Sequence, residues 1–143
     1  ELPLLLDKYK LDLIQFPGNI FDRRMEESGW LKTLNEAKID VHLRSVFLQG
    51  LLLIPSQNRP SFFNKWKTLF ERWDKWLVET NQTPVEACIS HAFAIQGIKK
   101  VIVGVDNVTQ LETIIHATES HYREPPFDLK SIDELLINPS YWQ

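Results

Sequence analysis

Three short apolar segments, each followed by a helical pattern, most constrain what this chain can fold into. They span residues 11–16 (LDLIQF), 39–45 (IDVHLRS) and 100–105 (KVIVGV). Short apolar strands joined through helices are typical of a parallel sheet buried between helices. The pattern therefore predicts an α/β fold with parallel strands, although three strands are few for such a sheet.

The connecting helices are predicted from the spacing of apolar residues. The segment 2–9 is leucine-rich and is predicted to end a helix, and residues 27–38 place Trp30, Leu31 and Leu34 on one helical face. The aromatic-rich segment 61–79 predicts a longer helix. Its tryptophans could suggest a calmodulin-binding or membrane-surface helix, but packing on the outside of a folded domain is the favoured interpretation.

Capping signals mark three further helices. Residues 83–97 begin with a threonine, a proline and, three positions after the threonine, a glutamate, which is a capping box with proline at the first helical position. Gly97 is predicted to end that helix. Residues 107–120 begin with the pair Asn107 and Gln110, and a tail helix is predicted to start at Ser131 with Glu134 completing its box.

Composition places the chain among ordinary globular proteins of one domain, residues 1–143. It is 43% hydrophobic and 24% charged, with a net charge of -3. This mild acidity gives no reason to expect nucleic acid or an anionic membrane as a partner, and no apolar run approaches the roughly 20 residues that span a bilayer. A single cysteine, Cys88, favours a reducing, cytoplasmic location. The first residue, Glu1, suggests a processed chain or a piece of a longer one.

Three stretches together carry a family resemblance. Residues 11–24, 41–53 and 101–115 resemble the sixth, seventh and eighth strands, with their following loops, of the aldo/keto reductases. The matching features are Gln15 with Asn19, Ser45 followed by Gly50-Leu51, and Gly104 followed by Gln110-Leu111. The resemblance implies the C-terminal part of a (β/α)8 TIM barrel, and an enzyme that transfers hydride between NADP or NAD and a carbonyl substrate.

The resemblance also implies what is missing. The family's catalytic Asp, Tyr, Lys and His come from earlier strands, and no position here matches them, so no catalytic residue is assigned and the chain alone is expected to be inactive. The four histidines and one cysteine have no ligand-like spacing, so no metal site is expected.

Two strand ends are implied to hold the nicotinamide part of the cofactor. Gln15 matches the family's glutamine that holds the nicotinamide amide; the alternative is a glutamine bonded to a neighbouring strand. Arg44 stands where many members carry an aromatic residue stacked on the nicotinamide ring. Its planar guanidinium could stack likewise, pair with the pyrophosphate, or form a salt bridge across the barrel mouth. Ser45 matches a serine whose neighbourhood contacts the pyrophosphate.

The loop after the second strand and the end of the third are implied to hold the rest of the cofactor. Gly50 is expected to permit close backbone approach. Gln110 matches a position that, as arginine in some members, binds the 2′-phosphate of NADP, and its neutrality leaves NADP or NAD open. The remaining expected contacts are the groove walls Phe47, Leu48 and Leu51, and Gly104 with Val105 at the adenosine end.

Two functions remain open at this point. The first is the C-terminal, cofactor-binding half of an aldo/keto reductase, with a nicotinamide cofactor and a small carbonyl as ligands. The second is a non-enzymatic interaction module built on a half barrel, which uses unpaired strand edges and the aromatic helix. Either way, a homo-oligomer or pairing with an N-terminal half is expected, because three strands leave two open edges.

Overall fold

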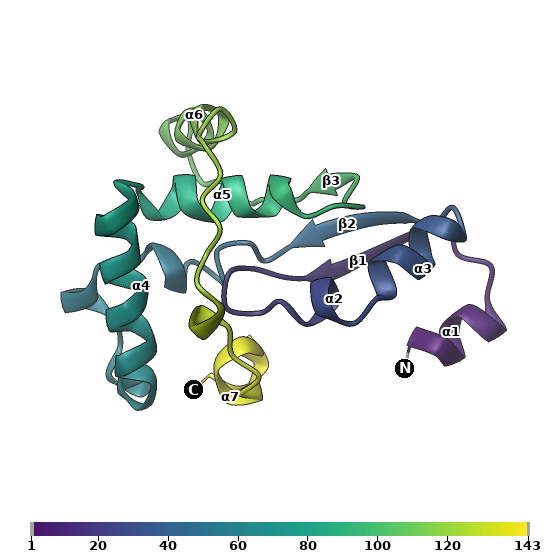
Figure 1. Ribbon diagram of the computed structural model, residues 1–143, viewed down its shortest axis with the longest axis horizontal. Helices are drawn as coiled ribbons and strands as arrows, with labels where there is room; N and C mark the ends of the chain where they lie inside the picture. The colour runs from purple at the N-terminus through teal and green to yellow at the C-terminus, as the bar shows by residue number, and fades with distance from the viewer. Residues whose placement is uncertain (1, 143) are drawn as a thin grey trace.

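The computed structural model describes residues 2–142 and contains a three-stranded parallel sheet (Figure 1). Strands β1 (Leu13–Pro17), β2 (Asp40–Arg44) and β3 (Lys100–Val101) lie in the order β1-β2-β3. Leu13 is opposite Asp40, and His42 is opposite Lys100. The α/β fold with parallel strands is confirmed.

Helices precede, connect and follow the three strands. Between the strands and after them lie short 3-10 turns as well as α-helices. The α-helices are α1 (Leu2–Lys8), α2 (Arg24–Glu27), α3 (Trp30–Glu36), α4 (Lys67–Thr80), α5 (Pro84–Ala94), α6 (Val108–Ala117) and α7 (Glu134–Ile137), and the 3-10 turns are η1 (Leu51–Leu53), η2 (Ser56–Asn58), η3 (Ser61–Trp66), η4 (Phe127–Leu129) and η5 (Pro139–Tyr141).

The core consists of two clusters that meet at Phe47. One joins the sheet to α3 and α5, through residues such as Leu34, Leu43 and Ile89. The other surrounds Trp73 of α4, which is fully buried. The opposite face of β1 is uncovered, and Leu13 there is 44% exposed. The sheet is therefore closed by helices on one face and open on the other at β1.

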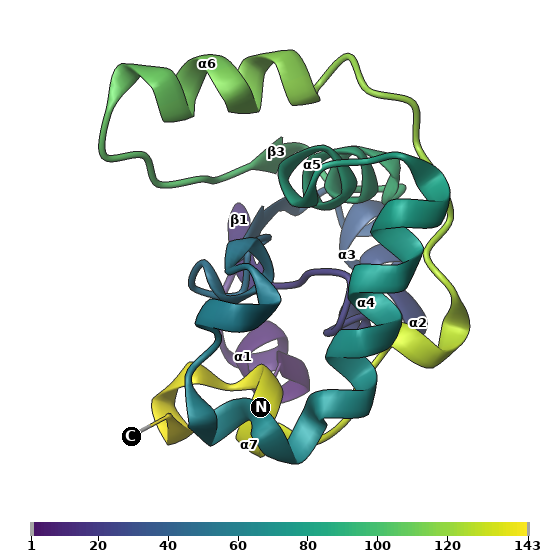
Figure 2. The same ribbon diagram turned by 90° about the vertical axis from the view of Figure 1, so that its left-hand side faces the viewer.

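The C-terminal segment crosses the molecule to reach α7. It leaves α6, passes α5 and ends near the loop that follows β1 (Figures 1 and 2). The Arg23 guanidinium donates to the carbonyl oxygens of Pro125 and Pro126, at 3.3 and 3.1 Å. Trp66 Nε1 donates to Asp133 Oδ2 at 3.0 Å. These bonds fasten the tail to both loops that leave β1 and β2.

Two predicted caps are confirmed. Thr83 Oγ1 accepts from the Glu86 N–H at 3.3 Å, and Glu86 Oε2 accepts from the Thr83 N–H at 2.7 Å, with Pro84 between them. Asn107 Oδ1 accepts from the Gln110 N–H at 2.9 Å. Both caps depend on residues three positions apart, which is why the sequence predicts them.

Several predicted boundaries are wrong for physical reasons. The helix expected over 27–38 begins only at Trp30, as α3, because Gly29 before it has φ of +78°; the short helix α2 ends before that glycine. The expected 61–79 helix begins as a 3-10 turn, and α5 ends at Ala94 rather than at Gly97. The tail helix is capped by Asp133, whose Oδ1 accepts from the Leu135 N–H, not by Ser131.

The third strand is also shorter than the predicted 100–105. Pairing ends soon after Val101, with a last bond from the Ile102 N–H to the Leu43 carbonyl at 2.8 Å. Beyond this point β2 offers no partner, because Ser45 turns away with φ of +60°. The segment 102–105 continues without pairing along the site described below.

The capping box gives the first testable prediction. Thr83→Ala should lower the free energy of unfolding by about 1 kcal/mol, because it removes the acceptor for the Glu86 N–H. Thr68→Ala, in the exposed part of α4, is the matched control and should change stability little. Urea denaturation of both variants checks this, and equal midpoints for the two would contradict a stabilising cap.

Candidate functional site

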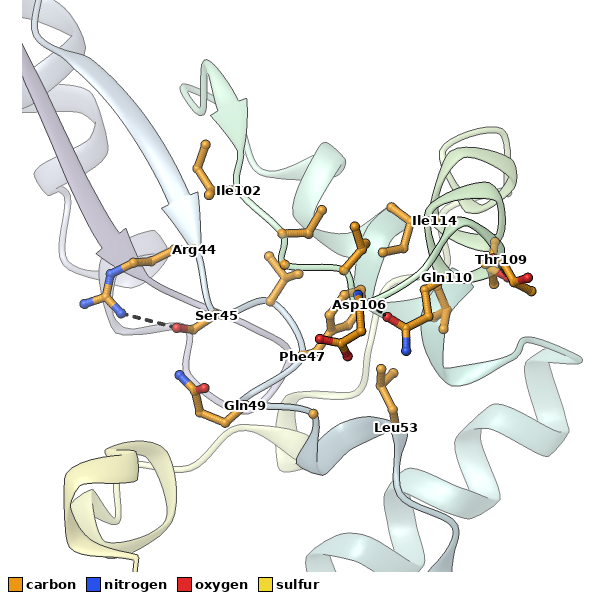
Figure 3. Close-up of a pocket in the computed structure, with 17 residues that line it drawn as sticks. Arg44, Ser45, Phe47, Gln49, Leu53, Ile102, Asp106, Thr109, Gln110 and Ile114 are labelled. Carbon is orange, nitrogen blue, oxygen red and sulfur yellow. Dashed lines mark hydrogen bonds between the residues drawn. The ribbon is translucent and has the colours of Figure 1, made fainter.

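A cavity of about 820 Å³ lies at the carboxyl ends of β2 and β3 (Figure 3). In parallel α/β folds this end of the sheet is where ligands bind. The wall is built by the end of β2 and its loop, by the segment after β3, and by the first turns of α5 and α6. The lining residues are Arg44, Ser45, Val46, Phe47, Gln49, Gly50, Leu53, Val85, Ile102, Val103, Gly104, Val105, Asp106, Thr109, Gln110, Thr113 and Ile114.

The loop that begins at Ser45 has an unusual backbone. Ser45, Leu48, Gln49 and Gly50 have φ values of +60°, +48°, +53° and +83°. Residues other than glycine adopt this left-handed region rarely, at a cost of about 1 to 3 kcal/mol each. Such conformations cluster at ligand-binding loops, where successive N–H groups can turn toward an anion. The loop is therefore the strongest backbone sign of a binding site.

Two leucines of this loop are buried in the core and hold the loop in place. Leu48 and Leu51 are each 1% exposed and lie in the cluster around Trp73. The Leu48 N–H donates to the Ser45 carbonyl at 2.9 Å, and the Leu51 N–H donates to the Leu48 carbonyl at 3.0 Å. The two side chains were expected as groove walls of a cofactor site. Neither lines this cavity, although Leu48 lines the smaller cavity described below. They hold the loop, whereas Phe47, also expected as a wall, does line the larger cavity.

The end of β2 supplies the cavity's cation. Arg44 is exposed, and its Nη1 donates to Ser45 Oγ at 3.3 Å (Figure 3). No carboxylate of the described residues lies within ion-pair distance of Arg44, so the alternative of a salt bridge across the barrel mouth is not formed in this part of the chain. Its guanidinium is thus available to a ligand.

Asn19 connects this strand end to the loop after β1. Its Oδ1 accepts from the N–H groups of Phe21 and Asp22, both at 3.0 Å, and its Nδ2 donates to the Ser45 carbonyl at 3.3 Å. Asn19 is 2% exposed. The residue therefore fixes the position at which Ser45 leaves the sheet.

On the side of the cavity opposite Arg44 lie Gly104, Asp106 and Gln110. Gly104 and Val105 line it as expected, and a Cβ added at Gly104 or at Gly50 would meet nothing within 4 Å. Gln110 also lines it, and its Oε1 accepts from the Asp106 N–H at 2.8 Å rather than from Asn107. A Cβ at either glycine would thus meet open space.

Sequence reasoning missed Asp106 and Gln49. Asp106 directly follows the last apolar segment, and functional side chains in this fold class lie at the carboxyl ends of strands. Its position in the sequence could therefore have identified it as a candidate site residue. Gln49 had no such signal, because its place at the rim follows from the left-handed turn of the loop.

Gln15 does not line this cavity. It lies on β1 opposite His42, and its side chain is exposed on the uncovered face of the sheet. A second, smaller cavity of about 330 Å³ lies between the ends of β1 and β2 and the tail, and Arg24 and Arg44 are among its lining residues. Arg24 keeps its charge, which the carboxylate of Asp22 balances: Asp22 accepts hydrogen bonds from Arg24 and raises its pKa. The contact expected between Gln15 and the nicotinamide stays a prediction.

Within 2–142, no group of three or more His, Cys, Asp or Glu side chains could hold a metal ion. No helix in this range is long and apolar enough to cross a bilayer.

The fold and cavity define a class: part of a parallel (β/α) barrel with a cavity at the carboxyl ends of its strands. A family model described as "Aldo/keto reductase family" matches residues 4–137. The chain therefore belongs to the aldo/keto reductase family, as its sequence motifs indicated.

Solved structures agree on the fold. The apo and holo forms of aldo-keto reductase AKR11C1 from Bacillus halodurans match with TM-scores of 0.61 and 0.62, each at 21% identity. Each match covers 86% of this chain but only 43% and 42% of those chains. The chain thus spans less than half the length of these structures. Among curated proteins, no match was found.

Asn19 gives the prediction for this site. Asn19→Ala should lower the free energy of unfolding by about 1 to 3 kcal/mol, because it leaves buried N–H groups of the following turn without an acceptor. Asn58→Ala, on an exposed turn, is the control and should be nearly neutral. Urea unfolding measures both, and an unchanged midpoint for Asn19→Ala would show that the turn forms without it.

Proposed function

We propose that this chain is the C-terminal, cofactor-binding half of an aldo/keto reductase that transfers hydride between NADP or NAD and a carbonyl substrate. The observation that carries the proposal is the cavity at the ends of β2 and β3, with its left-handed loop and unpaired Arg44. The bound nicotinamide would supply or accept the hydride. The chain's own residues would bind and orient the cofactor.

The residues present fit such a cofactor. The cavity volume lies in the usual range for small-molecule sites, about 300 to 1,000 Å³. Arg44 and Ser45 offer a cation and a hydroxyl to the pyrophosphate or to the nicotinamide ring. Gly50 and Gly104 leave room for close approach of a ligand to the backbone. Phe47, Val105 and Gln110 would complete the contacts.

Catalysis would need residues outside this chain. The family's proton donor and its partners match no residue here, so the other part of a barrel would have to supply them. The chain would then bind cofactor without reducing carbonyls.

Cofactor titration tests the proposal. The chain should quench or shift the fluorescence of NADH or NADPH, and Arg44→Ala should weaken that binding by about 1.5 to 3 kcal/mol, the range for a hydrogen bond to a charged group. Arg72→Ala removes the same side chain from the surface of α4, where it pairs with Asp128, and should bind like the parent.

The same samples should show no turnover of an aromatic aldehyde. Absence of binding of both cofactors would contradict the proposal, and measurable turnover by the purified chain would contradict the assignment of the acid to another part of a barrel.

A second function, protein association, is favoured by the apolar side chains left exposed beside the sheet edges. Leu13 on β1 is 44% exposed, Ile102 after β3 is 41% exposed, and Leu4 on α1 is 75% exposed. Strand edges next to apolar surface are templates for pairing with another chain. The partner would be the N-terminal half of a barrel or, in its absence, a second copy.

The isolated chain should accordingly not remain a monomer. Light scattering after size exclusion at micromolar concentration should give a mass at least twice 16.8 kDa. Leu13→Lys should shift the mass toward the monomer by placing a charge beside the open edge. Val78→Lys replaces an apolar residue that is 81% exposed on α4 and should leave the mass unchanged. A folded, monodisperse monomer of the parent chain would contradict association through the edges.

A further inference from the structure

The cavity at the ends of β2 and β3 has two charged residues, of opposite sign, on opposite sides. Among its lining residues only Arg44 and Asp106 carry a charge. Arg44 ends β2, whereas Asp106 lies across the cavity, beside Gln110 and next to the start of α6 (Figure 3). The cavity thus offers one cation on one side and one carboxylate on the other.

The polar groups beside Asp106 are held in place. The Asp106 N–H donates to Gln110 Oε1 at 2.8 Å, and the Gln110 N–H donates to Asn107 Oδ1 at 2.9 Å. Because its oxygen is occupied, Gln110 presents its amide N–H groups, which carry no net charge. Thr113 Oγ1 donates to the Thr109 carbonyl at 2.8 Å, which directs that hydroxyl to the helix backbone. This side of the cavity therefore contains no cation.

The carboxylate of Asp106 is free to meet a ligand. Asp106 is exposed, and among residues 2–142 it forms no ion pair within 4 Å. A carboxylate accepts hydrogen bonds from both hydroxyls of a ribose and repels a phosphate placed on the same ring. Acidic residues discriminate in this way between NAD and NADP in dinucleotide sites of other folds.

We propose that Asp106 selects NAD(H) over NADP(H) at this site. The inference rests on the proposed cofactor site and adds to it the class of cofactor. NAD has a single pyrophosphate, which Arg44 and Ser45 can serve from the other side of the cavity. NADP adds a phosphate on the 2′-oxygen, and the cavity has no second cation to neutralise it. The uncharged Gln110 cannot fill that role.

The test compares two cofactors and two fragments of them. Calorimetry should show that the chain binds NADH about tenfold or more tightly than NADPH, because the 2′-phosphate meets a carboxylate and no cation. The same order should hold for 5′-AMP over adenosine 2′,5′-bisphosphate, which removes the nicotinamide from the comparison. Asp106→Asn should reduce both ratios to within about threefold, and Asp106→Arg should reverse them.

The control removes an equal charge from α6, the helix that follows Asp106. Glu112 is exposed on α6 and does not line the cavity, so Glu112→Gln should keep the ratios of the parent chain. Circular dichroism confirms that each variant is folded.

The results separate this inference from the proposed function. Equal affinities for NADH and NADPH in the parent chain, or ratios that Asp106→Asn leaves unchanged while both ligands still bind, would overturn the role of Asp106 alone. Binding of neither cofactor would overturn the proposed site and this inference with it.

Discussion

The site depends on how the sheet stops at Arg44. The Gly18 N–H donates to the Arg44 carbonyl at 3.0 Å, and this is the last backbone–backbone hydrogen bond between the segments of β1 and β2. The approach is close, because a Cβ on Gly18 would lie 2.7 Å from Leu43 Cδ1. Glycine is therefore the residue that lets the chain leave β1 across the end of β2. Directly after this bond the backbone turns away from the sheet at Ser45, and the cavity lies between the end of β2 and the segment after β3.

Burial of leucines balances the strain of the loop that follows. Left-handed backbone at Leu48 and Gln49 is unfavourable, yet Leu48, Leu51 and Leu52 each bury a side chain completely or nearly so. Burying one leucine is worth about 1.5 to 3 kcal/mol, which is comparable with the cost of the backbone. The loop can therefore hold its shape without a ligand, and a preformed loop loses less entropy when a ligand binds.

Features that are set by neighbouring residues, such as helix caps, could be predicted from the sequence. Features that are set by residues far away in the sequence could not. The caps at Thr83 and Asn107 are set by residues three positions away, so the sequence contained the full cause. The length of β3 is set by where β2 ends, and no property of residues 102–105 reveals that limit. Leu48 and Leu51 show the same difficulty for the site, because an apolar loop residue can line a groove or anchor the loop beneath it. Only the direction of the loop backbone decides between the two.

The position of the cavity would explain how part of a barrel could carry most of the surface proposed for a cofactor. The cavity is bounded by consecutive units, β2 with its loop and β3 with α6, and it needs nothing from β1 beyond the contact through Asn19. Gln15, by contrast, lies on the open face of β1, where the remaining strands of a barrel would enclose it. Binding determinants that lie between neighbouring βα units survive the division of a barrel, whereas determinants that converge from opposite sides do not. This arrangement is a physical reason to expect cofactor binding and catalysis to separate in this chain.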